Sequence, residues 1–205
     1  MAIEVLKILR AGTHEAVDAR LYDDVTPQQL AEAEAKWKFL RYQAVLDLLK
    51  AGAPRERIPE NWHWDWAAKV ARAGAVGVRI FGIECEGEWQ GLMMTTTVGF
   101  VARLAPDVGQ ELVYVKYVES APWNLKAMTP TPRFSAVGVR LMETAVRESI
   151  DLGFGGRVGL HALPNAAAFY ARCGLVTTGV DAAVENLPYY ELTRAAATTF
   201  LGGTP

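Results

Sequence analysis

The chain has 205 residues, of which 51% are hydrophobic and 21% are charged, and its formal net charge at pH 7 is −2. This composition predicts a globular protein with a sizeable core, and so small a charge gives no electrostatic basis for binding nucleic acid or an anionic membrane. No apolar run approaches the roughly 20 residues of a membrane-spanning helix, no secretory signal opens the chain, and two cysteines make no disulfide framework. We therefore expect a cytoplasmic protein with one domain over residues 1–205.

Residues 1–75 are predicted to be mostly helical. The opening stretch IEVLKIL fits either a strand or the start of a helix. Thr26 then suits the N-cap of a long helix, Pro27 its first position and Gly52 the residue after its end. A second, short helix is expected to begin at His63 and to end before Gly74.

Residues 76–194 change to the pattern of a sheet with connecting helices. A β-hairpin is expected over residues 75–104, with its turn at residues 86–88, and the Val and Tyr content indicates a further strand over residues 110–120. Residues 137–152 place apolar side chains on one helical face and charged ones on the other, which predicts an amphipathic helix.

The apolar stretch RVGLHAL, residues 157–163, predicts a buried strand parallel to the strand before the amphipathic helix. Asn165 is expected to cap a short helix that ends at Gly174. Two strands and a weakly structured end are expected to follow. These elements predict a mixed α/β fold, a sheet flanked by helices with a helical N-terminal third.

The stretch TPTPRFSAVGV, residues 129–139, joins a proline-rich loop to the amphipathic helix. A helix N-terminus presents unpaired N–H groups and the positive end of the helix dipole, and both attract anions. Small residues at Ser135, Ala136 and Gly138 let a ligand approach the backbone closely, and Arg133 adds charge. The stretch predicts either a cradle for pyrophosphate or an ordinary loop-to-helix connection.

Two stretches, RFSAVGVRLM and NAAAFYARCGL, resemble in order and spacing the GNAT superfamily of acyl-CoA-dependent N-acetyltransferases. That family places an Arg/Gln-x-x-Gly-x-Gly/Ala loop at a helix start, which is matched by Arg133–Gly138, with Ala136 where the family prefers glycine. We expect a negative φ at Ala136, as at an ordinary helix start. The family's Asn and aromatic pair are matched by Asn165, Phe169 and Tyr170.

The resemblance implies a twisted GNAT-like sheet and direct transfer of an acetyl group from acetyl-CoA to an amine. A backbone amide at Tyr117 or Val118 would polarise the thioester carbonyl. Tyr170 would protonate the departing thiolate, because the phenol pKa of about 10 is near that of the thiol; packing on the sheet is its alternative role. The residues implied in binding acetyl-CoA are Tyr117, Val118, Arg133, Phe134, Ser135, Ala136, Val137, Gly138, Val139, Asn165 and Tyr170.

Two residues are candidates for the base. Glu119 lies at the end of the strand over residues 110–120, where the family often carries a carboxylate. His161 lies near the end of the next strand, and its ordinary pKa suits the task, but a hydrogen-bonded structural role is the alternative. Some members of the family need no side-chain base.

The aromatic stretch NWHWDW, residues 61–66, is interpreted as a cover for the core rather than as a substrate box. His63 and Asp65 within it lack the further ligands of a metal site, so no metal is expected. A thiol nucleophile formed by Cys173 with His161 is the least favoured reading of those two residues.

The segment between residues 121 and 131 is longer than the connection usual in the family. Trp123 and Asn124 either border the substrate channel or pack the insertion, and packing is favoured. The function expected is an N-acetyltransferase for an amine on a small molecule, a protein or an aminoacyl group. The alternative is a degenerate domain that binds acyl-CoA or a protein partner without catalysis. A homodimer is compatible with either function.

Overall fold

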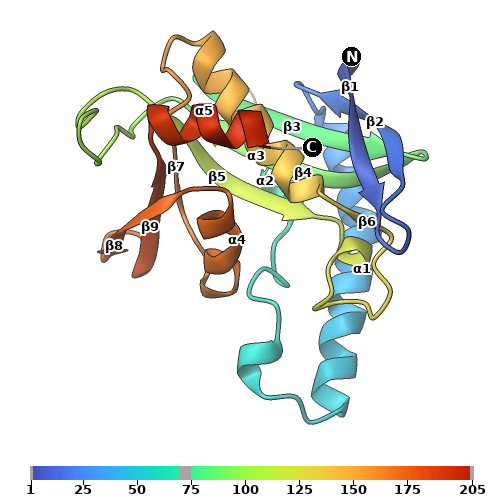
Figure 1. Ribbon diagram of the computed structural model, residues 1–205. Coiled ribbons are helices and arrows are strands. Elements are labelled where there is room, and N and C mark those ends of the chain that lie inside the picture. Colours follow the sequence, from blue (N-terminus) through green and yellow to red (C-terminus); the bar gives the residue numbers. More distant parts are fainter. Residues whose placement is uncertain (1, 70–74, 204–205) are drawn as a thin grey trace. The chain divides into compact units, whose positions relative to one another are not determined.

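The computed structural model describes residues 2–69 and 75–203 (Figure 1). Its strands are hydrogen-bonded in the order β6-β1-β2-β3-β4-β5-β7-β9-β8. The chain folds into two compact units. The first comprises Met1–Ala75, Arg79–Met93 and Val118–Arg140, and the second comprises Val76–Val78, Met94–Tyr117 and Leu141–Pro205. The single domain expected over residues 1–205 stays a prediction.

The first unit opens with a hairpin of two antiparallel strands, β1 (Ala2–Arg10) and β2 (Ala16–Tyr22). The expectation of a mostly helical N-terminal part is wrong here. Val5 and Lys7 are exposed whereas Ile8 is buried, which is the two-residue alternation of a half-buried strand. The stretch that fitted either a strand or a helix is therefore a strand.

The second hairpin of the sheet consists of β3 (Val78–Cys85), which pairs with β2, and β4 (Glu88–Thr96). Glu86 and Gly87 connect the two strands and have φ values of 55° and 76°. Positive φ at both residues is the conformation of the tightest hairpin turns. The predicted hairpin and the position of its turn are confirmed.

The long helix α1 (Pro27–Lys50) has the predicted bounds and cap. The Thr26 side chain accepts a hydrogen bond from the Gln29 N–H, and the Gln29 side chain accepts one from the Thr26 N–H. This capping box satisfies two backbone donors that the helix itself leaves unpaired. The buried face of α1 comprises Leu30, Ala33, Glu34, Trp37, Arg41 and Val45.

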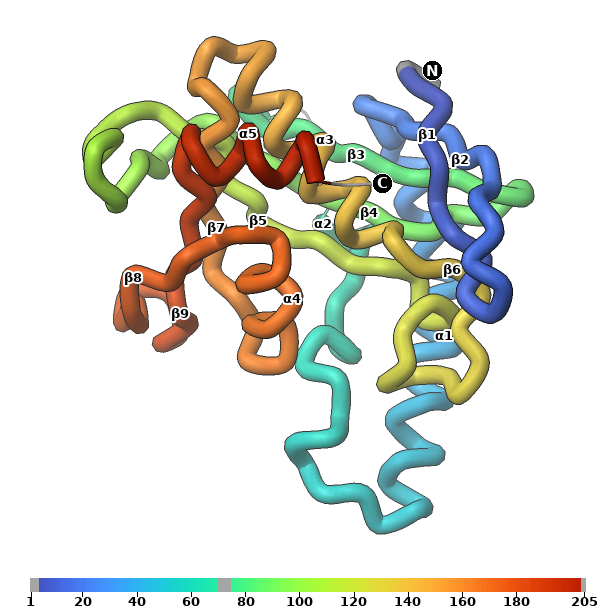
Figure 2. The backbone as a smooth tube through the Cα atoms, viewed as in Figure 1, coloured from blue at the N-terminus to red at the C-terminus, as the bar shows by residue number. Residues whose placement is uncertain are grey.

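After α1 the chain turns back beside this helix through the short helix η1 (Arg55–Arg57), as Figure 2 shows. The next helix, α2 (Trp66–Lys69), begins three residues after His63, where the expected helix begins. The Asp65 side chain accepts a hydrogen bond from the Ala68 N–H at 2.9 Å and so caps the helix at this later position. Residues 70–74 lie outside the described residues.

In the second unit, β7 (Val158–His161) runs parallel to β5 (Val113–Ser120), whose last three residues belong to the first unit. The helix α3 (Val137–Asp151) lies between these strands in the chain, so this part of the prediction is confirmed. Antiparallel β9 (Leu187–Leu192) and β8 (Val176–Asp181) extend the sheet from β7.

Three details of the second unit differ from the predictions. Ile150, one of the apolar residues in the predicted amphipathic helix, is 47% exposed. Asn165 lies in η4 (Pro164–Ala166), so the residue at the N-cap of α4 (Ala167–Arg172) is Ala166. The chain end is not weakly structured but forms α5 (Arg194–Gly203), which starts where the Thr193 hydroxyl accepts a hydrogen bond from the Ala196 N–H. The run of alanines in α5 favours a helix.

Candidate active site

The loop that leads into α3 lies entirely in the first unit and is held on its N-terminal side by the sheet. Two of its residues form β6 (Phe134–Ser135), which pairs antiparallel with Leu9 and Arg10 of β1. The Ala11 N–H donates a further hydrogen bond to the carbonyl of Arg133. The backbone just before the helix is therefore fixed by a strand from the far end of the sequence.

Ala136, between β6 and α3, has a φ of 67°, so the expectation of a negative φ is wrong. The left-handed conformation costs an L-residue about 1–2 kcal/mol, whereas glycine adopts it freely. β6 on one side and the Arg140 N–H to Ala136 carbonyl hydrogen bond of 3.0 Å on the other hold the residue in place. The loop thus keeps, at a cost, the backbone shape that a glycine would give it.

The first turn of α3 presents backbone donors at this point. The first hydrogen bond of the helix is donated by the Arg140 N–H to the Ala136 carbonyl. The N–H groups of Val137, Gly138 and Val139 lie before it in the first turn, where a helix offers its N–H groups no acceptor of its own. The positive end of the dipole of this 15-residue helix lies at the same place. These groups suit an anion, and pyrophosphate is the anion that the sequence predicted.

The Arg133 side chain is paired with acidic side chains and is not free to bind an anion without breaking these ion pairs. It forms ion pairs with Glu88 and, at 3.8 Å, with Glu86, and it lies over the Trp123 ring. Burial would raise the pKa of Glu88, but its hydrogen bonds and charge interactions with Arg133 and Lys36 outweigh this effect and lower the pKa. The anion-binding capacity of the loop therefore rests mainly on its backbone donors.

The inserted segment before the loop packs around one buried side chain, Gln90. The Trp123 Nε1–H donates to Gln90 Oε1 at 2.9 Å, and Asn124 Nδ2 donates to the same oxygen at 3.0 Å. Asn124 Oδ1 in turn accepts from the Phe134 N–H at 3.0 Å. The expected packing role of Trp123 and Asn124 is confirmed, and Asn124 links this packing to the loop.

Glu119, one of the two candidate bases, lies at the end of β5 with its side chain fully buried in the first unit. It accepts hydrogen bonds from Arg41 Nη1 at 3.0 Å, Asn61 Nδ2 at 2.8 Å and Trp66 Nε1 at 2.6 Å. Burial raises the pKa of Glu119 to about 7, although Arg41 and Trp66 act in the opposite direction. Three donors hold the carboxylate, so it fixes the segment that carries Asn61 and Trp66.

Sequence reasoning missed the partners of Glu119 on α1. Arg41 also donates to Glu34 and to the Trp64 carbonyl, and Glu34 accepts the Trp66 N–H at 2.9 Å. A signal was present, because Glu34 and Arg41 are seven residues apart and share the helix face of Trp37. Two opposite charges on the apolar face of a helix indicate a buried ion pair.

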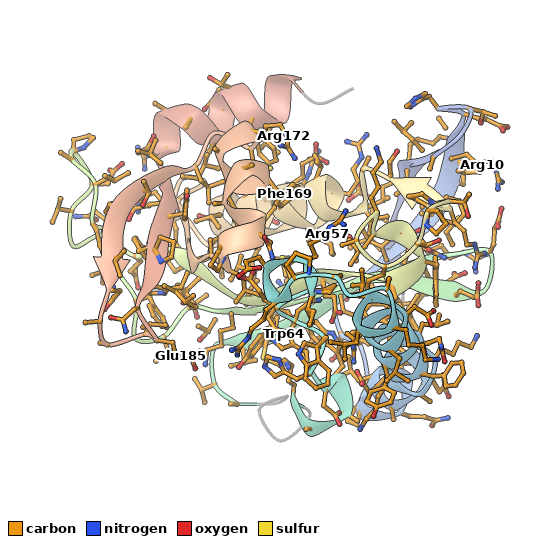
Figure 3. The ribbon with its side chains drawn as sticks, turned by 90° about the horizontal axis from the view of Figure 1, so that it is seen from below. Arg10, Arg57, Trp64, Phe169, Arg172 and Glu185 are labelled. Carbon is orange, nitrogen blue, oxygen red and sulfur yellow. The ribbon has the colours of Figure 1, made fainter. Side chains whose placement is uncertain are left out.

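The three tryptophans of residues 61–66 have different environments. Trp66 is fully buried and Trp64 is half-buried, whereas Trp62 is 40% exposed. The expected role as a cover for the core therefore holds for Trp66. Figure 3 shows Trp64 on the stretch before α2.

Trp62 borders a pocket of about 580 Å³ between the C-terminal half of α1 and residues 55–63. The lining of the pocket is largely apolar and includes aromatic and a few charged side chains. Its lining residues are Tyr42, Val45, Leu46, Leu49, Arg55, Ile58, Pro59, Glu60, Trp62 and His63. A volume of this size suits a small organic molecule.

Tyr170, the predicted proton donor, lies on α4 in the second unit and is 7% exposed. Phe169 and Arg172 mark the same helix in Figure 3. Burial raises the pKa of Tyr170 well above its ordinary value, with smaller effects of Cys173 and Tyr114 in the same direction. The phenol therefore keeps its proton at neutral pH, as a proton donor must.

His161, the other candidate base, is held through both ring nitrogens in the second unit. Nδ1 lies 2.6 Å from the Tyr114 hydroxyl and Nε2 lies 3.1 Å from Asp181 Oδ2, and only 2% of the side chain is exposed. The structural role that was the alternative for His161 fits these contacts.

Burial raises the pKa of the Cys173 thiol to about 11, so this side chain is a thiol rather than a nucleophilic thiolate at neutral pH.

The remaining predicted residues lie on two elements. Tyr117 and Val118 are consecutive in β5, and Asn165 is in η4. Within residues 2–69 and 75–203, no three His, Cys, Asp or Glu side chains gather as metal ligands would. In the same residues, no helix combines the length and apolar character needed to cross a membrane.

Comparison with protein-family models gives no match, and comparison with curated proteins gives none either. Solved structures do match. An acetyltransferase of the GNAT family from Listeria monocytogenes is similar over 91% of this chain and 99% of its own, with a TM-score of 0.54 and 15% identity. PaiA N-acetyltransferase from Thermoplasma acidophilum, solved with coenzyme A, is similar over 85% and 98%, with a TM-score of 0.52 and 11% identity. The chain thus has the GNAT fold.

Proposed function

We propose that this protein is a GNAT-type acyltransferase that moves an acetyl group from acetyl-CoA to an amine. The observation that carries the proposal is the left-handed conformation of Ala136 at the start of α3. Because costly backbone conformations are often found at ligand sites, the conformation of Ala136 beside the N–H groups of α3 supports a ligand that needs this backbone shape. The GNAT fold and the coenzyme A bound to PaiA from Thermoplasma acidophilum support acetyl-CoA as that ligand.

The pyrophosphate of acetyl-CoA would bind the N–H groups of Val137, Gly138 and Val139. Hydrogen bonds to a charged group are worth about 1.5–3 kcal/mol each, and the helix dipole adds to them. The Arg133 side chain would have to leave Glu88 to reach a phosphate, so we assign it to holding the loop.

The acetyl group would be transferred by direct attack of a neutral amine on the thioester carbonyl. The N–C bond forms as the C–S bond breaks, the amine loses one proton, and coenzyme A leaves as a thiol. A backbone N–H at Tyr117 or Val118 would polarise the carbonyl. Tyr170 would supply the proton to sulfur, because the phenol is protonated at neutral pH, although the burial that raises its pKa also makes it a weaker acid.

We assign positioning roles to Glu119 and His161 in place of direct proton transfer. Each is surrounded by hydrogen-bond partners that a substrate would have to displace. The acceptor would then lose its proton to solvent. A degenerate domain that binds acetyl-CoA without catalysis is the second candidate function, because the same contacts leave both candidate bases engaged.

The pocket beside α1 is our candidate for the body of the acceptor. Asn61, which lies between the lining residues Glu60 and Trp62, donates to Glu119 at the end of β5. The pocket wall is therefore joined to the strand that carries Val118. Its aliphatic and aromatic lining residues favour an amine with an apolar body.

A turnover assay with a panel of amines tests this function. Release of the coenzyme A thiol from acetyl-CoA is followed with amines that carry aromatic or branched aliphatic bodies and with small polar amines of similar pKa. We expect turnover that depends on the acceptor and is faster with the apolar bodies. Binding of acetyl-CoA without turnover for any amine would favour the degenerate domain.

A further inference from the structure

Lys69, the last residue of α2, brings a primary amine to the end of β5. Its Nζ lies 5.0 Å from the ring centroid of Trp64 and 5.6 Å from that of Trp66. Trp66 donates its Nε1–H to Glu119 Oε2 at 2.6 Å. The amine thus rests on the ring that contacts Glu119, and Glu119 follows Val118 directly in the chain.

The surroundings of Lys69 favour its neutral form more than water does. Burial lowers the pKa of the Lys69 ammonium, and the nearby Arg41 charge acts in the same direction. The carboxylates of Glu119, Glu34 and Asp65 oppose this effect without cancelling it. A desolvated lysine of this kind is a better nucleophile than an exposed one, because more of it is deprotonated near neutral pH.

The geometry points to Lys69 as an acetylation site that the protein modifies itself, with acetyl-CoA bound at the α3 loop as the donor. This inference rests on the proposed function, because it needs acetyl-CoA to place its thioester at the end of β5. It differs from that function in the acceptor, which is an amine of the same chain.

The reaction balances in the same way as transfer to a free amine. The Lys69 ammonium first releases one proton. The neutral Nζ then attacks the carbonyl carbon, so that an amide N–C bond forms and the thioester C–S bond breaks. The nitrogen loses a second proton to solvent, and coenzyme A leaves as a thiolate. The thiolate is protonated to the thiol, so one acetyl-CoA yields one acetyl-lysine and one coenzyme A.

Acetylation would change the first unit locally. The amide carries no charge, so it would lose the cation–π attraction to Trp64 and Trp66 and the charge interaction with Glu119. These two tryptophans belong to the segment that also carries Trp62 at the pocket. Self-acetylation would therefore act on the wall of the candidate acceptor pocket.

Mass spectrometry of peptides from the full-length protein after incubation with acetyl-CoA tests the inference. We expect Lys69 to gain one acetyl group before Lys36 and Lys38, which are more exposed lysines of α1 and serve as internal controls. The rate should not change when the protein is diluted, because donor and acceptor lie on one molecule. Lys69→Arg should abolish this modification.

Desulfo-CoA supplies a control that needs no variant. As a competitor at the donor site, it should stop acetylation of Lys69 by acetyl-CoA but not modification of the exposed lysines by acetic anhydride. Equal acetylation of Lys36, Lys38 and Lys69, insensitive to desulfo-CoA, would overturn the inference. Calorimetric binding of acetyl-CoA with an unmodified Lys69 would overturn it while leaving the proposed function intact, whereas absence of binding would remove the proposed function itself.

Discussion

The Glu119 carboxylate and the Arg41 guanidinium form an ion pair of 3.0 Å between two side chains that are both completely buried. They are 78 positions apart in the sequence and join the end of β5 to the middle of α1. Arg41 has a second carboxylate partner in Glu34, so the cluster carries one positive and two negative groups when all are ionised. Such a cluster fixes the elements that meet at it more than it stabilises the fold.

Removal of one partner should therefore be costly. We expect Glu119→Ala to lower the free energy of unfolding by about 3–5 kcal/mol, because Arg41 would keep its burial and lose a counter-charge. Urea denaturation of the variant and the wild type measures this difference. Glu32→Gln, at an exposed position of the same helix, is the control and should change stability by less than about 0.5 kcal/mol. A similar small effect for Glu119→Ala would contradict the account of the buried pair.

The pKa of Glu119 also predicts how stability depends on pH. Burial raises it to about 7 in the native state, from 4.5 as its ordinary value. The native carboxyl thus holds its proton more tightly than the unfolded one, so its contribution to stability is complete below about pH 4.5 and is lost as the pH rises through about 7. The stability difference between the wild type and Glu119→Gln should therefore shift in favour of Glu119→Gln between pH 5 and pH 8. A difference that is constant over this range would show that the native pKa is not raised.

Replacing Ala136 by glycine should stabilise the protein. Glycine relieves a left-handed conformation that costs alanine about 1–2 kcal/mol, partly offset by the greater freedom of glycine in the unfolded chain. Thermal or urea unfolding should show a gain of about 0.5–1 kcal/mol, and coenzyme A binding should be retained. The matched control is Ala31→Gly, in an exposed and ordinary helical position of α1, which should instead destabilise by about 1 kcal/mol.

Tyr170→Phe should separate catalysis from binding. The change removes the proton donor without altering the packing of the ring, so we expect turnover to fall by about 10²–10⁴ while the affinity for acetyl-CoA stays the same. The loss should be equal across neutral pH, because burial raises the pKa of Tyr170 far above that range. Tyr190→Phe is the control, since its ring centroid lies 6.1 Å from that of Tyr170. Unchanged turnover in Tyr170→Phe would exclude the phenol as the acid.

The sequence predicted the helices, strands and turns that are determined by residues close together in the chain. The capping box of Thr26 and Gln29 defines the start of α1 within four residues, and the Glu86-Gly87 turn needs only two residues with positive φ. The amphipathic period of α3 and the apolar run of β7 likewise lie within single elements. These parts of the fold follow from propensity and pattern.

The parts that the sequence did not predict depend on distant partners. Ala136 was expected to have a negative φ because alanine prefers it, but pairing of β6 with β1 overrides that preference from more than a hundred residues away. Glu119 was a candidate base because it lies at a strand end where the resembled family often carries a carboxylate, whereas in the structure Arg41 and Asn61 enclose it. His161 was similarly enclosed by Tyr114 and Asp181.

Calorimetric titration of the purified protein with acetyl-CoA tests the central claim most directly, with desulfo-CoA and ATP as comparison ligands. We predict binding near micromolar, about −8 kcal/mol, that persists in Ala136→Gly and is lost in Ala136→Pro, whose ring forces a negative φ. Circular dichroism shows whether the proline variant is folded. Absence of heat up to millimolar acetyl-CoA with the wild-type protein would contradict the pyrophosphate cradle at the start of α3.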